Sequence, residues 1–154
     1  MNIFKLIVTF FFIGNVRIAP GTIASFATVI IFYAFAKYFN VFSFMLTISA
    51  ITLLSFVAIG AYTNDLLEKD KSEIVIDEVI GQSIALLPLL IFVENISSNF
   101  FMCIISFLFF RFFDIVKPFP INKIDKMNNT FGVIFDDILA GFFAALLLTF
   151  ALRF

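Results

Sequence analysis

The feature that most constrains this chain is the stretch from Val41 to Tyr62, which contains no charged side chain. About 20 apolar residues are enough for one helix to cross the hydrocarbon core of a bilayer. The rest of the chain has the same character, since 62% of its 154 residues are hydrophobic and only 14% are charged. A soluble domain of this size could not bury that much apolar surface, so we expect an integral membrane protein.

Further apolar runs predict an all-α, multi-helical membrane bundle of about five long helices in a single domain, residues 1–154. The runs do not alternate apolar with polar residues, as the strands of a membrane barrel do. Met1 to Ile13 is a short apolar segment without a cleavage site after it, so we interpret it as a retained interfacial or re-entrant element. The five expected helices are Thr22–Phe39, Val41–Tyr62, Val79–Val93, Phe100–Phe113 with an extension to Val116, and Ile138–Leu152.

Simple alternation of these helices across the membrane predicts that the polar clusters share one face. The face that holds the start of the first long helix also receives the segments 64–78, 114–133 and 136–137. Lys and Arg are more numerous there than on the opposite face, and the positive-inside rule makes such a face cytoplasmic. The basic residues assigned to it are Arg17, Lys69, Lys71, Arg111, Lys117, Lys123 and Lys126, against Lys5, Lys37 and Arg153 on the other.

Composition also excludes several kinds of chemistry. The chain has no His, so the commonest general base and the commonest zinc ligand are missing. The single Cys103 lies in an apolar run and cannot form an intrachain disulfide. The net charge of −1 gives no case for a nucleic-acid partner.

Two pairs of adjacent carboxylates are expected to open apolar helices on the same face. Asp77 and Glu78 precede one apolar run, and Asp136 and Asp137 precede another. A helix N-terminus favours one carboxylate, but two neighbouring ionised groups repel each other unless a cation relieves the repulsion. Oxygen ligands of this kind suit Mg²⁺, so these four residues are candidate metal ligands, with Asp77 and Asp137 also candidate catalytic residues.

A second set of charged residues predicts a phosphate-binding face. Arg111, Asp114 and Lys117 are spaced three apart, so they share one side of a helix that ends before Pro118. Arg111 and Lys117 can neutralise phosphate and are candidate substrate-binding residues, while Asp114 can orient Arg111 or bind metal. Arg111 and Asp114 are also candidate catalytic residues. Thr22, after Pro20-Gly21, is a candidate helix N-cap and substrate-binding residue.

These motifs resemble the phosphatidylglycerophosphatase A family along nearly the whole chain. Two glycines usually precede Phe-Gly in that family, where this chain has Asn129 and Thr130. The matching stretches are APGTIASFA (19–27), EIVIDEVIGQSIAL (73–86), FRFFDIVKPFPINKID (110–125) and FGVIFDDILAGFFA (131–144).

The resemblance implies a Mg²⁺-dependent lipid phosphatase that converts phosphatidylglycerophosphate into phosphatidylglycerol and phosphate, in the bacterial inner membrane with its site facing the cytoplasm. It maps Asp77, Glu78, Asp136 and Asp137 onto the acidic motifs of the family. Either water or an aspartate would be the nucleophile. The alternative from another class is a small ion-coupled transporter that uses the acidic pairs as an ion site.

Overall fold

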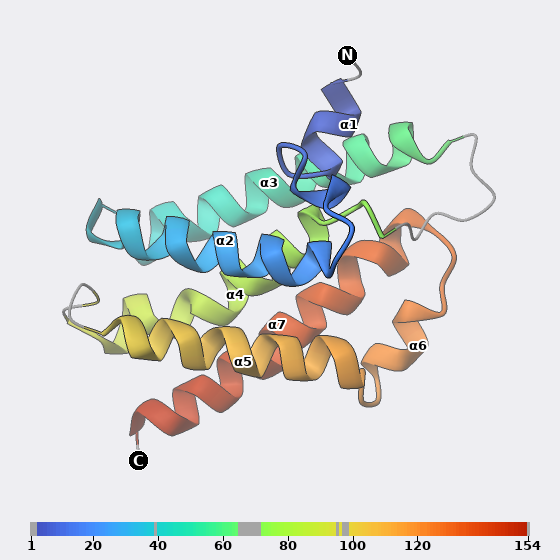
Figure 1. The fold of residues 1–154 in the computed structure, drawn as a ribbon. Coiled ribbons are helices and arrows are strands. Elements are labelled where there is room, and N and C mark those ends of the chain that lie inside the picture. The colour runs from blue at the N-terminus through green and yellow to red at the C-terminus, as the bar shows by residue number, and fades with distance from the viewer. Residues whose placement is uncertain (1–2, 39, 65–71, 95, 97–98, 154) are drawn as a thin grey trace.

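The computed structural model describes residues 3–38, 40–64, 72–94, 96 and 99–153, and in these ranges it is helical without strands (Figure 1). The basic residues Lys69 and Lys71, which contribute to the predicted charge bias, lie outside the described residues. The helices are α1 (Ile3–Val8), α2 (Pro20–Phe35), α3 (Val41–Tyr62), α4 (Ile76–Phe92), α5 (Phe100–Val116), α6 (Ile121–Asp125) and α7 (Thr130–Arg153), with 3-10 turns η1 (Ile13–Asn15) and η2 (Ala36–Tyr38).

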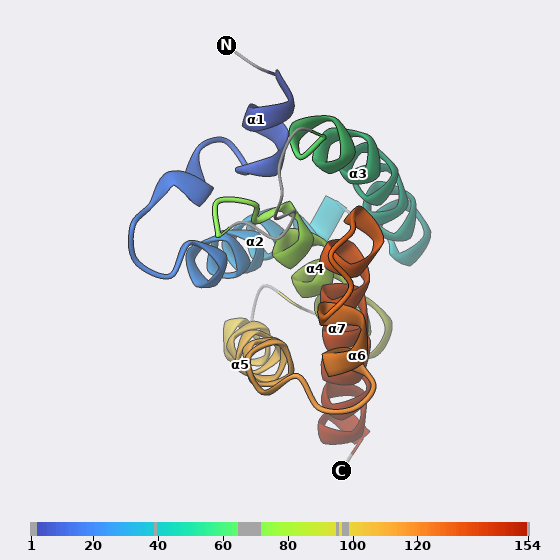
Figure 2. The same ribbon diagram turned by 90° about the vertical axis from the view of Figure 1, so that its right-hand side faces the viewer.

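Helix α4 is the centre of the bundle, with α2, α3, α5 and α7 packed around it (Figure 2). Its buried residues include the apolar Val79, Ile80, Leu86 and Leu89 and also the polar Asp77. By contrast, α3 exposes large apolar side chains along much of its length. Such an outward apolar surface is expected of a helix that faces lipid.

Among the described residues, three helices are long and apolar enough to cross a membrane: Pro20–Tyr38, Val41–Tyr62 and Thr130–Arg153. Helices α4 and α5 have 17 residues each, which corresponds to about 25 Å of helix. The N-terminal apolar segment forms only the short helix α1, of 6 residues, followed by turns. With a length of about 9 Å, α1 by itself cannot span a bilayer.

The long helices alternate in direction as the sequence predicts (Figure 1). The α2–α3 connection and the C-terminus lie at one end of the bundle, where the Arg153 guanidinium stacks over the Phe92 ring at 5.2 Å. The end of α3, the starts of α4 and α7, and α6 lie at the other end. All the predicted polar clusters that the structure describes therefore meet at one end.

Three local predictions were wrong. Helix α7 starts at Thr130 and not at Ile138, because the Asn129 side chain accepts a 2.7 Å hydrogen bond from the Gly132 N–H and caps it. Asp136 and Asp137 consequently lie in its second turn. Part of the expected 118–133 loop also forms helix α6.

The start of α2 also differs, because Ala19 rather than Thr22 is the N-cap, and it adopts a left-handed conformation with φ of 47°. Pro20 follows as the first helical residue, a position where its fixed φ and missing N–H cost nothing. The α3 start matches its prediction, since Asn40 and Ser43 form a reciprocal capping box.

Candidate functional site

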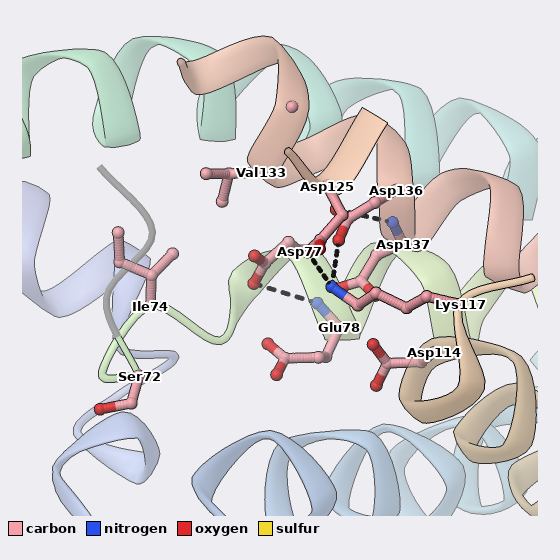
Figure 3. A pocket seen from close by; sticks show the side chains of 11 residues that line it. Ser72, Ile74, Asp77, Glu78, Asp114, Lys117, Asp125, Val133, Asp136 and Asp137 are labelled. Atoms are coloured by element: carbon pink, nitrogen blue, oxygen red, sulfur yellow. Dashed lines mark hydrogen bonds and ion pairs between the residues drawn. The ribbon is translucent and has the colours of Figure 1, made fainter. Parts of the chain in front are cut away.

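Residues from α4, α5, α6 and α7 enclose a small polar cavity of about 90 Å³ at the end of the bundle where the charged motifs meet (Figure 3). Six of the eight residues that the sequence singled out line it, and Asp125 joins them. The charged lining residues are Asp77, Glu78, Asp114, Lys117, Asp125, Asp136 and Asp137, and the others are Ser72, Ile74, Gly132 and Val133.

Two glycines set the separation of the acidic pairs from α4 and α7. Gly81 lies one turn after Asp77, and Gly141 lies one turn after Asp137. A Cβ atom on Gly141 would lie 2.2 Å from the Gly81 carbonyl oxygen, and one on Gly81 would lie 2.5 Å from the Asp137 carbonyl oxygen. The two helix backbones can approach this closely only because both positions lack a side chain.

The close crossing brings three carboxylates together. Asp77, Glu78 and Asp137 can each offer one oxygen such that the three oxygens lie within 4.8 Å of one another. Asp77 and Asp137 are buried, and the Oε2 of Glu78 and the Oδ1 of Asp137 have no hydrogen-bond partner. Buried, unpartnered carboxylate oxygens at this separation fit a hard divalent cation such as Mg²⁺.

Lys117 supplies positive charge among the carboxylates that line the cavity. It is the C-cap of α5, with a left-handed φ of 45°, and its Nζ donates to Asp136 Oδ2 at 2.7 Å and also to Asp125 (Figure 3). Burial lowers the pKa of Lys117, but the two carboxylates outweigh burial and hold it above the ordinary value. The side chain is therefore a fixed ammonium group.

Asp136 has a different environment from its neighbour Asp137. Its Oδ2 accepts the hydrogen bond from Lys117, and its Oδ1 accepts one from the Asp137 N–H at 3.0 Å. Both of its oxygens thus have partners already, whereas Asp137 retains a free one. This difference favours Asp137 over Asp136 as a metal ligand.

Arg111 lies beside the cavity and is anchored by Asp114. The two side chains form an ion pair of 2.5 Å across one turn of α5, and Arg111 also donates to Ser25 of α2 at 3.5 Å. The Nε of Arg111 is buried without a partner. One donor of this guanidinium thus stays available, while Asp114 fixes the orientation of the group.

The start of α2 contributes to the site through Gly21 and not through Thr22. A Cβ on Gly21 would lie 1.9 Å from Glu78 Oε1, so the glycine lets this carboxylate reach the positive end of the α2 dipole. Thr22 itself is half-buried and does not line the cavity.

The sequence interpretation did not identify Asp125 as a site residue. Its position at the end of the motif 110–125 was a signal, but its role depends on α6 returning toward Lys117. The assignment of Lys5 to the opposite face was wrong, because Lys5 pairs at 3.5 Å with Glu73, whose carboxylate accepts a 2.6 Å hydrogen bond from the Tyr62 hydroxyl at the site end of α3.

Comparison with known proteins agrees with these motifs. The family model described as phosphatidylglycerophosphatase A matches residues 6–152. A phosphatidylglycerophosphatase A of Haemophilus influenzae is 32% identical over all of this chain and 91% of its own length. The Escherichia coli protein of the same name is 30% identical over 97% of this chain and 83% of its own length.

A protein of Bacteroides thetaiotaomicron, provisionally named a phosphatidylinositol-3-phosphatase, is 34% identical over 95% of this chain and 91% of its own length. No solved structure was found to match the chain.

Proposed function

Because the chain belongs to the phosphatidylglycerophosphatase A family and is therefore a phosphatase that acts on a phosphomonoester, we propose that its substrate is phosphatidylglycerophosphate. The observation that carries the proposal is that three clustered acidic side chains and a fixed ammonium group line the same cavity. Such a cavity suits the terminal phosphate of a lipid headgroup, while the acyl chains stay in the bilayer. The products are phosphatidylglycerol and inorganic phosphate.

We further propose that Asp77, Glu78 and Asp137 hold Mg²⁺. When bound there, the ion supplies Lewis-acid polarisation of the phosphate and lowers the pKa of a coordinated water. The free oxygens of Glu78 and Asp137 support this assignment. Asp136, which the sequence also suggested as a ligand, is instead assigned the role of orienting Lys117.

The basic residues have separate roles in this scheme. Lys117 lines the cavity and neutralises a phosphate oxygen, and Arg111 presents its free Nε–H from the side. Asp114 and Asp125 position these two cations. As a water oxygen bonds to phosphorus, the bond to the glycerol oxygen breaks and the leaving alcohol takes up a proton.

The competing transporter hypothesis would require an ion path through the membrane. The acidic residues that line the cavity instead lie together at one end of the bundle. Family membership also assigns the chain to the phosphatases. Hydrolysis therefore explains the acidic site, and no ion path through the membrane is needed.

The substrate proposal is tested by phosphate release from purified protein in mixed micelles. Phosphatidylglycerophosphate is compared with phosphatidylinositol 3-phosphate at equal surface concentration, with the Asp137→Asn variant as the blank. We expect a higher kcat/KM for phosphatidylglycerophosphate. A preference for the inositol lipid would contradict the proposed substrate while leaving the phosphatase assignment intact.

We also propose that the site faces the cytoplasm of a bacterial inner membrane, because Lys and Arg are more numerous at this end. Cys103 is buried, so a single exposed cysteine can report on the topology. A membrane-impermeant maleimide should label Lys37→Cys in intact spheroplasts and Lys126→Cys only in inverted vesicles. The reverse pattern would place the site on the outer face.

A further inference from the structure

A second, apolar groove lies where α1, α2 and α3 meet α4, the elements drawn around the upper part of Figure 2. It consists of two cavities, of about 220 Å³ and 170 Å³. Both are lined by Phe10, Ile51 and Val79, so they are neighbouring parts of one groove. The proposed phosphatase reaction makes no use of it.

The groove is dry. Four hydroxyl groups reach it, and each one already donates to the carbonyl four residues earlier in its own helix, at 2.7–2.9 Å. An ordered water needs two to four polar partners, and these side chains have no donor left to offer. The four residues are Thr28, Thr47, Ser55 and Ser83.

The groove also runs along the helices rather than across them. On α3 it extends from Phe44 to Ser55, which corresponds to about 16 Å of helix. Its walls include α2 and α3, both long and apolar enough to cross a membrane. At that depth the surrounding medium is lipid hydrocarbon, which fits an elongated and apolar space.

The groove and the carboxylate cavity lie on opposite sides of α4. Ile76, Val79 and Ser83 face the groove and share one side of the helix, whereas Asp77 and Glu78 face the cavity. An acyl chain in the groove therefore contacts α4 on the side away from the carboxylates.

We propose that this groove is a binding site for one acyl chain of a resident bilayer phospholipid, distinct from the substrate. Phe10 and Phe11, which line the groove, and the next residue Phe12 all have left-handed backbones, with φ of 42°, 55° and 71°. Non-glycine residues adopt this conformation at a cost, and the cost is concentrated where Phe10 contacts both cavities. The bound acyl chain packs against the side of α4 opposite Asp77 and Glu78.

The chain contains no Trp, so one introduced Trp is a specific probe of the groove. Phe10→Trp is titrated in detergent micelles with phosphatidylcholine carrying bromine in its acyl chains, which quenches nearby indole fluorescence. We expect saturable quenching at a stoichiometry near one lipid. Leu53→Trp, on the exposed surface of α3 outside the groove, should show quenching that rises without saturation. Thr47→Trp serves as a second groove probe if Phe10→Trp does not fold.

Filling the groove provides the decisive comparison. In the Trp-probe background, Ser55→Leu should weaken lipid affinity by at least ~10-fold. Ser49→Leu is the matched control, because Ser49 has the same backbone hydrogen bond on α3 but is exposed and outside the groove. Equal affinity in both variants would overturn the proposal. So would quenching by a brominated phosphatidylglycerophosphate but not by phosphatidylcholine, which would assign the groove to the substrate chain.

Discussion

The contact between Gly81 and Gly141 should control catalysis from outside the cavity. A Cβ added at Gly141 would lie 2.2 Å from the Gly81 carbonyl oxygen, whereas ordinary contacts begin at 3.4 Å. In the Gly141→Ala variant α4 and α7 must therefore separate locally by about 1.2 Å, because the opposing atom belongs to the backbone and cannot rotate away. Asp77 and Asp137 lie one turn from this contact, so the distance between their carboxylates increases.

A misplacement of about 1 Å can reduce an enzymatic rate by about 100-fold, so we expect a loss of that order in kcat/KM for Gly141→Ala. Overpacking should cost about 1–3 kcal/mol of stability, partly offset by up to about 1 kcal/mol because Ala favours a helix over Gly. The variant should therefore remain folded while its kcat/KM falls by about 100-fold.

Gly60→Ala is the matched control for this experiment. The nearest atom to a Cβ at Gly60 is Thr130 Oγ1 at 3.9 Å, which leaves room for the methyl group. Phosphate release and the unfolding temperature are measured for both variants and the wild type. Near-normal activity of a folded Gly141→Ala protein would refute the reasoning that the helix separation positions the carboxylates.

Three further predictions concern single side chains. Asp137→Asn should lower phosphate release by at least ~100-fold and weaken Mg²⁺ binding in calorimetry; normal Mg²⁺ affinity would remove Asp137 from the metal site. Lys117→Gln should lower kcat/KM by a similar ~100-fold, whereas Lys123→Gln on the neighbouring helix should leave it unchanged; equal effects would mean that only general charge matters. Asn129→Ala should destabilise the protein by about 1 kcal/mol through loss of the α7 cap, and an unchanged unfolding temperature would show that the cap contributes nothing.

The sequence predicts the long helices well where polarity changes sharply along the chain. Val41–Tyr62 was predicted residue for residue, because Asn40 caps one end and an apolar run follows without interruption. The start of α7 was placed too late because Asp136 and Asp137 look like helix-opening residues. In fact the preceding apolar residues 131–135 already belong to the helix, and the local pattern does not distinguish a second turn from a first.

The composition of the site was predicted better than its geometry. Helix alternation is enough to bring the acidic and basic motifs to one end of the bundle. Which carboxylate pairs with Lys117 depends on the return of α6, which the local sequence pattern does not specify. The backbone contact at Gly81 and Gly141 joins residues far apart in the chain, and each glycine alone is an unremarkable helix residue.

The most direct test of the central claim is the Mg²⁺ dependence of phosphate release from phosphatidylglycerophosphate by the purified protein. The protein is stripped with a chelator, and Mg²⁺ is then returned at increasing concentration to the wild type and to Asp137→Asn. The account predicts no turnover after stripping, full recovery of the wild type with Mg²⁺, and little recovery of the variant. Turnover that persists without Mg²⁺, or a folded wild type that releases no phosphate under any condition, would contradict it.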